Sequence, residues 1–369
     1  MKLTGQIVLP DRIVSGTVEF DETGIHSITP EPEAGSRIIL PGFIDGHVHG
    51  GDGADTMDGV AAIHRLSRFH LTHGTTTILP TTITSPWPDV MDALRAVTEA
   101  RNARPENGPV IHGAHLEGPF VSPHKLGAQP PFAIPPTPDR VGEALETGIV
   151  RVVTLAPELD HADTAIRSFA AAGVRVSLGH TVAGYEEAEL AICRVCAAGG
   201  TVGATHLFNA MAPIESRRPG PVTALMCGDT GYAEMIFDTH HVHPATFRLA
   251  SRVMGERLLF VTDAMRGAGQ AEGPSQLGGQ DVVIRDGAVR LPDGTLAGSV
   301  LTLDVALRNA VTVGGVSLPA ASRLTSTSPA AYLGLHDRGR IAPGLRADLV
   351  LMEEGFDVAE VFVGGERVV

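Results

Sequence analysis

The strongest constraint on the fold is an alternation of apolar, β-branched runs with segments of helical character between Gly42 and Met265. Segments between the runs, such as residues 60–73 and 88–104, carry helix-forming residues with helical apolar spacing. Strands that alternate with helices predict a parallel sheet, and eight strands are the number that closes a (β/α)₈ barrel. The eight runs are residues 42–49, 74–84, 109–118, 150–158, 174–181, 201–208, 233–242 and 257–265.

The positions of the polar residues favour a closed barrel over an open doubly wound sheet, which is the alternative. Most runs end in a histidine or a carboxylate: His47 and His49, Glu117, His180, His206, His241 and Asp263. In a closed barrel the carboxyl ends of all strands meet on one face, so these groups would lie together. In an open sheet some of them would lie far from the others. We therefore predict an α/β fold with a (β/α)₈ TIM barrel over residues 42–339.

The two ends of the chain have a different pattern. Residues 1–41 and 340–369 form short alternating runs separated by glycine turns, which predicts a small β-sandwich domain built from both termini. Residues 280–295 contain two Asp-Gly turn signals and predict a β-hairpin inserted after the eighth barrel strand. Residues 301–313 are then expected to form the helix that closes the barrel.

Charge and hydropathy exclude several classes of partner. The net charge of the 369 residues is −14, which argues against broad binding to nucleic acid or to an anionic membrane. No run of about 18 apolar residues occurs, and the start of the chain lacks an apolar segment with a small-residue cleavage site. We expect a soluble cytoplasmic protein in which any anionic ligand meets a local cluster of positive groups.

Histidines and carboxylates at the ends of the runs indicate a metal site. Side chains alternate along a strand, so His47 and His49 project to the same side and could grip one ion. In a chain with sixteen histidines this pair alone is weak evidence. Glu117, His180 and His206 add carboxylate and imidazole ligands of the kind that suit zinc or iron. Asp263 beside such an ion could accept a proton from water and later deliver it to a leaving group.

Several motifs extend this prediction. HLEGPF (115–120), GHT (179–181), THLFNAM (205–211), VTDA (261–264) and AGSVLTLD (297–304) occur in this order along the chain. With these motifs the whole chain resembles the N-acetylglucosamine-6-phosphate deacetylase family of the amidohydrolase superfamily. The resemblance implies that Glu117, His180 and His206 bind a catalytic divalent metal and that Asp263 is the general acid and base.

The number of ions stays open at this stage. His47 and His49 match a position where some members of the family hold a second metal and others have lost the pair. Many binuclear relatives use a carbamylated lysine as the bridge, but Lys2 and Lys125, the only lysines, lie outside the barrel runs. A bridge from Glu117 is the remaining option. The ligands would accept zinc, iron, manganese or cobalt, and zinc or iron is preferred.

The same resemblance implies how the substrate is bound. Asn209 and the backbone of Ala210, together with Arg217 and His241, are expected to hold a phosphate group. Arg217 aligns with an arginine that reaches into the site of a neighbouring subunit, which implies a homodimer. The alternative for Arg217 is a solvated surface arginine beside Arg218.

One position departs from the family pattern. Gln129 stands where the family usually has a histidine that helps to hold the sugar. A glutamine amide still forms hydrogen bonds but cannot become a cation, so the preference for one sugar over another is open.

The expected reaction is hydrolysis of the acetamide of N-acetyl-D-glucosamine 6-phosphate to D-glucosamine 6-phosphate and acetate. Deacetylation of N-acetylgalactosamine 6-phosphate or of an N-acyl amino acid is a second interpretation. A third is a non-catalytic amidohydrolase-fold subunit with a role in assembly.

Overall fold

Parallel strands within the predicted apolar runs form the barrel wall in the computed structural model, which describes residues 1–105 and 107–369. Each run contains at least one strand, and the third run contains two short strands. The strands are β5 (Phe43–Val48), β8 (Thr75–Pro80), β9 (Val110–Ile111), β10 (Ala114–Glu117), β11 (Val150–Leu155), β12 (Arg175–Leu178), β13 (Val202–Ala204), β14 (Ala233–Met235) and β15 (Leu258–Phe260).

Hydrogen bonds and bridges close these strands into a ring. β5 pairs with β8, β8 with β9, and β14 with β15, while β10 to β13 form a continuous four-stranded sheet. A parallel bridge between Thr81, just after β8, and His115 of β10 joins these two strands, and the Ala204 amide donates to the Tyr232 carbonyl between β13 and β14. The bridge from Val48 to Ala264 completes the ring. The closed barrel is therefore confirmed, and the open doubly wound sheet is excluded.

A helix follows each of the eight runs along the chain, and the sequence explains several helix ends. α3, α6 and α7 each begin at a proline, whose fixed φ suits the first turn and whose missing N–H is not needed there. α4 is followed by Gly173 with φ 78°, a left-handed conformation that glycine adopts at little cost. The helices are α1 (Val60–Thr72), α2 (Trp87–Asn102), α3 (Pro138–Glu146), α4 (Ala162–Ala171), α5 (Tyr185–Ala197), α6 (Pro221–Cys227), α7 (Pro244–Met254) and α8 (Leu303–Thr312).

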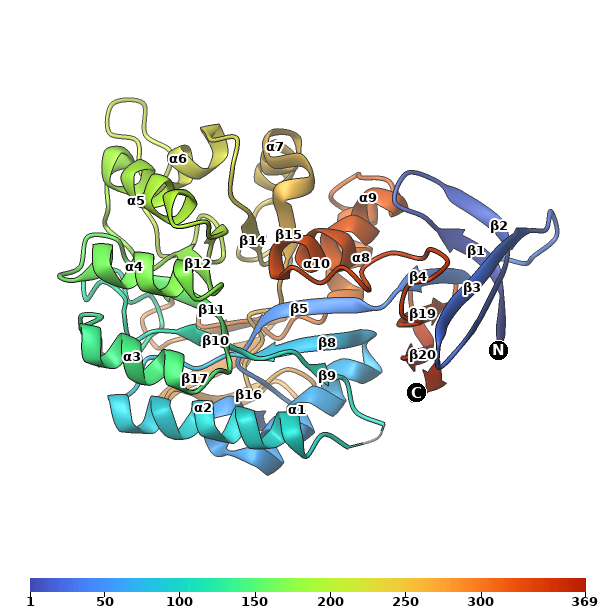
Figure 1. Cartoon of the computed structure of the whole chain (residues 1–369), viewed down its shortest axis with the longest axis horizontal. Coiled ribbons are helices and arrows are strands. Elements are labelled where there is room, and N and C mark those ends of the chain that lie inside the picture. Colours follow the sequence, from blue (N-terminus) through green and yellow to red (C-terminus); the bar gives the residue numbers. More distant parts are fainter. Residues whose placement is uncertain (106) are drawn as a thin grey trace.

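Both termini contribute to one seven-stranded sheet in the order β21-β20-β19-β4-β1-β2-β3. Its strands are β1 (Lys2–Val8), β2 (Ile13–Asp21), β3 (Gly24–Pro30), β4 (Ile38–Pro41), β19 (Leu349–Met352), β20 (Val358–Val363) and β21 (Glu366–Arg367). β2 and β20 are four strand spacings apart in this order, so in a flat sheet they would lie about 19 Å apart. However, the rings of Phe20 in β2 and Phe362 in β20 are 5.2 Å apart between centroids. The sheet therefore curls around a core of its own, which includes Ile39 and Leu349. Figure 1 shows it at one side of the barrel, with both chain ends.

Polar contacts fix this sheet to the barrel. The Gly42 amide, just before β5, donates to the Asp348 carbonyl at 2.8 Å. The buried Asp348 carboxylate contacts Arg346 at 2.8 Å and Arg338 at 3.3 Å, and Arg338 also donates to Thr77 in β8. The terminal sheet thus lies near the starts of β5 and β8 and leaves the carboxyl ends of the strands free.

A three-stranded antiparallel sheet lies between β15 and α8. It consists of β16 (Gly273–Leu277), β17 (Gln280–Arg285) and β18 (Ala288–Arg290). The turn between β17 and β18 is Asp286-Gly287, with φ values of 51° and 73°, as a tight hairpin turn requires. Leu277 and Val282 pack against Ile83.

Short elements complete the described chain. They are β6 (Gly50–Gly51), β7 (Ala54–Asp55), η1 (Thr56–Asp58), η2 (Gly255–Arg257), α9 (Leu318–Ser322), the π-helix η3 (Arg323–Thr327) and α10 (Ser328–Leu333). Among the helices of residues 1–105 and 107–369, none combines the length and apolar character needed to cross a bilayer.

Candidate metal centre

The ends of the barrel strands bring six histidine and carboxylate side chains together. His47 lies in β5 and Glu117 ends β10, while His49, His180, His206 and Asp263 follow β5, β12, β13 and β15 within three residues. His180, His206 and Asp263 have φ values of 48°, 32° and 48°, a left-handed conformation that non-glycine residues seldom adopt. Such strain costs about 1–3 kcal/mol per residue and is typical of functional sites. It turns each side chain away from the line of its strand.

Glu117, His180 and His206 form the first ligand group. Glu117 Oε1 lies 3.2 Å from His180 Nε2 and 3.1 Å from His206 Nε2, and these two nitrogens are 3.0 Å apart. The other nitrogen of His180, Nδ1, lies 3.0 Å from the Lys125 carbonyl oxygen. That contact holds the ring with Nε2 toward the carboxylate.

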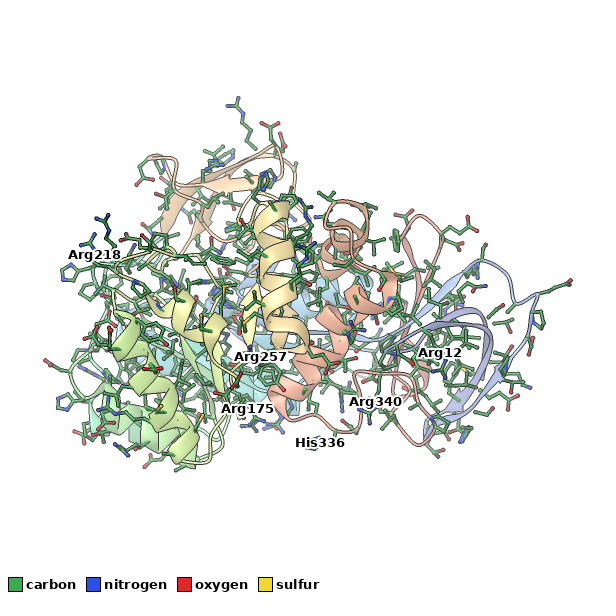
Figure 2. The ribbon with its side chains drawn as sticks, turned by 90° about the horizontal axis from the view of Figure 1, so that it is seen from above. Arg12, Arg175, Arg218, Arg257, His336 and Arg340 are labelled. Atoms are coloured by element: carbon green, nitrogen blue, oxygen red, sulfur yellow. The ribbon has the colours of Figure 1, made fainter. Side chains whose placement is uncertain are left out.

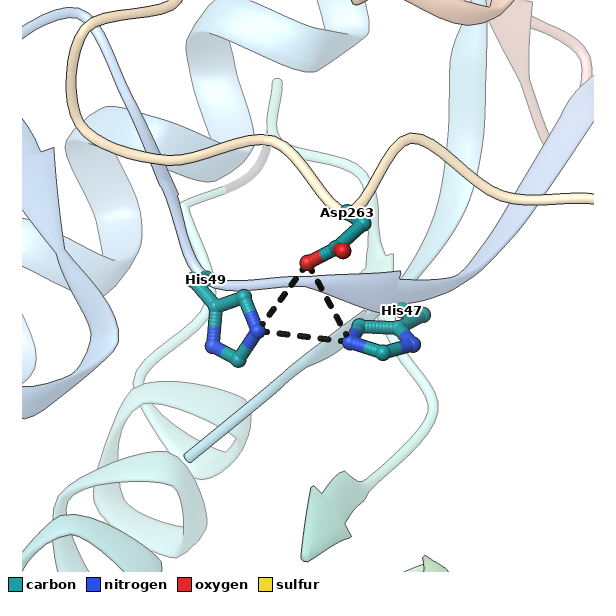
Figure 3. A group of neighbouring side chains, drawn as sticks. All are labelled: His47, His49 and Asp263. Atoms are coloured by element: carbon teal, nitrogen blue, oxygen red, sulfur yellow. Dashed lines mark hydrogen bonds and ion pairs between the residues drawn. The ribbon is translucent and has the colours of Figure 1, made fainter. Parts of the chain in front are cut away.

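His47, His49 and Asp263 form the second ligand group, shown in Figure 3. The two Nε2 atoms are 3.3 Å apart, and Asp263 Oδ1 lies 3.4 Å from His47 Nε2 and 3.2 Å from His49 Nε2. Glu117 connects the two groups, because its Oε2 lies 3.1 Å from His49 Nε2. One carboxylate therefore faces both sets of imidazoles.

These distances fit bound divalent ions. Two nitrogens bound to one tetrahedral zinc at 2.0–2.1 Å lie about 3.3–3.4 Å apart. The Nε2 separations of 3.0 Å and 3.3 Å come close to this value. All six residues are at most 8% exposed, so water offers little competing solvation. The residues present thus fit one ion at each group, with Glu117 as the bridge.

The electrostatics of the cluster also favour a cation. Burial lowers the pKa of His49, but Asp263 and Glu117 raise it more, to about 9. Burial raises the pKa of Asp263, whereas His47 and His49 lower it to about 2. For Glu117, too, the neighbouring imidazoles outweigh burial and hold the pKa well below its usual range. The two carboxylates are therefore ionised, and the cluster favours a positive charge beside them, on the imidazoles or on a divalent ion.

The cluster opens into a pocket of about 190 Å³. His49, Glu117, His180, His206 and Asp263 form its floor. Ile83 from the barrel, Leu277 from β16 and Leu296 form an apolar part of the wall. The pocket leaves the floor accessible to a small ligand.

Three of the predicted substrate residues line the same pocket, namely Asn209, Ala210 and His241. His241 Nδ1 lies 2.6 Å from Asp238 Oδ2, and the Asp238 carboxylate also accepts the His241 amide at 2.8 Å. Asp238 therefore orients the ring and leaves Nε2 for a ligand. Ala210 has φ 49°, part of the sharp turn that follows β13.

Gln129 also lines the pocket, but its amide bonds to the protein on both sides. Its Nε2 donates to Glu117 Oε2 at 2.6 Å, and its Oε1 accepts the Thr84 amide at 2.7 Å. The side chain is 8% exposed. The expected contact with the sugar stays a prediction, while the observed contact is with the bridging carboxylate.

Arg217 is not brought to this pocket within one chain. It lies in an exposed loop, where Glu215, Ser216, Arg217 and Arg218 surround a separate surface hollow. In Figure 2 the adjacent Arg218 lies at the end of the molecule opposite Arg12 of the terminal sheet.

Sequence reasoning missed two buried residues behind His47. Glu234 Oε2 lies 3.0 Å from His47 Nδ1, and the His115 ring lies 4.5 Å from the His47 ring between centroids. Glu234 sits inside an apolar strand, and His115 belongs to the HLEGPF motif. A charged residue in the middle of an apolar barrel strand was the available signal, because unpaired buried charge is costly.

Histidine and carboxylate side chains grouped at the carboxyl ends of the strands of a closed (β/α)₈ barrel are typical of metal-dependent hydrolases. The Amidohydrolase family model matches residues 38–368. The chain belongs to the amidohydrolase family.

Individual relatives narrow the comparison. The chain is 35% identical to N-acetylgalactosamine-6-phosphate deacetylase of Escherichia coli O157:H7, over 96% of this chain and 93% of the relative. It is 36% identical to N-acetylglucosamine-6-phosphate deacetylase of Bacillus subtilis (strain 168), over 87% of this chain and 82% of the relative. A solved structure of N-acetyl-D-glucosamine-6-phosphate deacetylase from Mycobacterium smegmatis, a mutant in complex with N-acetyl-D-glucosamine-6-phosphate, matches with a TM-score of 0.92. The two chains are 34% identical, over 100% of this chain and 99% of that one.

Proposed function

We propose that the chain is a metal-dependent deacetylase that hydrolyses the acetamide of N-acetyl-D-glucosamine 6-phosphate to D-glucosamine 6-phosphate and acetate. The observation that carries the proposal is Glu117 between two imidazole pairs, with Asp263 beside it on the floor of an open pocket. The relatives that bear this activity in their names support the same reaction.

Glu117, His180 and His206 would hold a divalent ion, which would supply Lewis-acid chemistry at the acetamide carbonyl and lower the pKa of water. Asp263 then takes the proton of the attacking water. Its carboxylate lies beside the ligand histidines on the pocket floor, where it can accept that proton. An amine is a poor leaving group unless it is protonated, so Asp263 delivers this proton to the departing nitrogen.

We assign the phosphate to the side of the pocket that carries His241, Asn209 and the Ala210 backbone. His241 offers Nε2, and Arg217 from a second subunit would add a bidentate donor. A homodimer follows from this role of Arg217, which otherwise lies in an exposed loop outside the pocket. N-acetylgalactosamine 6-phosphate is the second candidate substrate, since one relative at 35% identity is named for it.

The finer assignments belong to the same proposal. Zinc or iron is the preferred metal, because both accept imidazole and carboxylate ligands. Residues 1–41 with 340–369 form the terminal domain, and residues 42–339 form the catalytic barrel with its inserted hairpin. A cytoplasmic location stays a prediction from the sequence.

The test compares acetate release from the two N-acetylated hexosamine 6-phosphates, the same sugars without phosphate, and an N-acetyl amino acid. We expect turnover of at least one 6-phosphate and a kcat/KM at least about 100-fold lower without the phosphate, since charge-assisted contacts are lost. Equal rates with and without phosphate would remove the assigned role of His241 and Arg217. Preferred hydrolysis of the N-acetyl amino acid would contradict the proposed substrate class.

A further inference from the structure

A buried carboxylate lies directly behind the second ligand group. Glu234 belongs to β14, and its side chain enters the barrel interior, where it is 1% exposed. Its Oε2 lies 3.0 Å from Nδ1 of His47, while Nε2 of the same ring faces His49 and Asp263. Among the described residues, the other oxygen of Glu234 has no hydrogen-bond partner. Among the described residues, the His47 ring is therefore the hydrogen-bond donor to this carboxylate.

This contact selects one tautomer of His47. A carboxylate accepts hydrogen bonds only, so Nδ1 must carry the proton. In the neutral ring Nε2 is then left with its lone pair directed at the cluster, which is the form that binds a metal. The His115 ring packs edge-on against His47 at 4.5 Å and restricts its rotation further. The ring is held from two sides.

The surroundings argue against a separate ion between Glu234, His47 and His115, although these side chains lie close enough for one. Both nitrogens of His115 are already engaged, Nδ1 with the Gly46 carbonyl at 3.1 Å and Nε2 with Thr154 Oγ1 at 2.7 Å. His47 Nδ1 is engaged with Glu234. Hydrogen bonds within the protein therefore fill the ligand positions, and Glu234 acts on the ion through His47.

The other three ligand histidines lack such a carboxylate. His180 Nδ1 contacts the Lys125 carbonyl, and Nδ1 of His49 and of His206 finds no partner among the described residues. Among the four ligand histidines, the one in contact with a buried carboxylate through Nδ1 is thus His47. His47 belongs to the pair whose metal binding the sequence left open. A buried carboxylate is costly to keep, and a structural filler would not require a charge at this position.

We propose that Glu234 is a positioning residue: through its contact with Nδ1 it holds the His47 ring as a ligand in the second group, and so strengthens the binding of a divalent ion by His47 and His49. The inference rests on the proposed metal-dependent function, and its test counts ions rather than turnover.

The experiment measures zinc bound to chelator-stripped protein equilibrated with buffered free zinc, by elemental analysis. The wild type should bind two equivalents. Glu234→Gln should bind the second equivalent about 10- to 100-fold more weakly and retain the first, because outer-shell partners have effects of this size. Met235→Leu, at the next buried position of the same strand, is the matched control and should bind both ions as the wild type does.

A His47→Gln, His49→Asn variant gives a second, independent comparison. It should bind one equivalent, and adding Glu234→Gln to it should change nothing further, because Glu234 acts only through His47. Circular dichroism checks that each variant is folded.

Three results would overturn the inference: wild type that binds a single ion at excess zinc, Glu234→Gln that binds the second ion with unchanged affinity, or Glu234→Gln that loses both ions together. Failure of the proposed deacetylation would be distinguishable, because it would leave these zinc counts unaffected.

Discussion

The amide of Gln129 links the pocket wall to the Glu117 carboxylate, with one hydrogen bond to Glu117 and one from Thr84. Gln129→Met keeps the length of the side chain and removes both bonds, which leaves the buried Thr84 amide unsatisfied, while Glu117 Oε2 keeps His49 as a partner. We expect the free energy of unfolding of the metal-free protein to fall by about 1–3 kcal/mol, the cost of one orphaned buried group. Urea denaturation measures it.

Gln276→Met is the control for that change, because Gln276 bonds to Asp281 on the exposed surface of the hairpin. Its unfolding free energy should stay within about 0.5 kcal/mol of the wild type. Equal losses in the two variants would show that the Gln129 bonds contribute nothing specific.

The residue types at the strand ends were enough to predict which residues form the site. They were not enough to predict the contacts among its side chains. The ends of the apolar runs identified His180, His206 and Asp263, because parallel strands in a barrel deliver their carboxyl ends to one face. The partners of Gln129 and Glu234 depend on which side chains meet across the barrel, which linear spacing does not encode. Glu234 therefore went unnoticed within an apolar run.

Side chains of β17 in the inserted sheet point alternately into the core and into solvent. In β17, Val282 is 2% exposed and packs with Ile83 and Leu277 beneath the pocket wall, while its neighbour Val283 is 53% exposed. Val282→Ala should lower the unfolding free energy by about 1.5–3 kcal/mol through lost burial and a new cavity. Val283→Ala should change it by less than about 0.5 kcal/mol. Urea titration of both variants tests the difference, and similar losses would contradict the packing described for this sheet.

At the scale of elements, the apolar runs located the barrel strands because buried parallel strands are apolar along their length. The sequence pattern did not indicate strand β16 or the division of the third run into β9 and β10. β16, GPSQL, alternates between half-exposed and exposed positions up to Leu277, so it lacks a run of apolar residues. Its pairing with β17 was set by contacts that its own composition does not reveal.

The stability of the whole molecule is expected to depend on pH through the buried His70. His70 in α1 is fully buried, and burial lowers its pKa to about 4, while its Nε2 lies 2.9 Å from the Gly50 carbonyl. The unfolded chain, with an ordinary value of 6.5, binds more protons between pH 6.5 and pH 4. Stability therefore falls on acidification through this window, by about 3 kcal/mol from this residue.

His70→Gln removes that titration and retains a donor for the Gly50 carbonyl. We expect its unfolding free energy to depend less steeply on pH between 6.5 and 4 than that of the wild type, as measured by urea titration at several pH values. Substitution of the exposed His336 by glutamine serves as the control. Parallel pH profiles for His70→Gln and the wild type would contradict this account of His70.

The proposed dimer can be tested by complementation between inactive subunits. Arg217→Ala and Asp263→Asn subunits should each have low activity alone. If Arg217 acts in the partner's site, a mixed dimer contains one intact site, and random mixing should restore about a quarter of the wild-type rate. A mixture that shows only the sum of the separate activities would contradict action between subunits.

Asp263 is the residue that we expect to move the proton in the proposed metal-dependent hydrolysis, and Asp263→Asn removes that ability. Asparagine tolerates the φ of 48° at this position and keeps one oxygen toward the cluster, but it cannot carry the proton. The measurement is acetate release from N-acetyl-D-glucosamine 6-phosphate, made together with a count of bound metal. We predict that kcat falls by at least about 100-fold while the metal held by Glu117, His180 and His206 stays bound. Turnover at the wild-type rate with that metal in place would contradict the account.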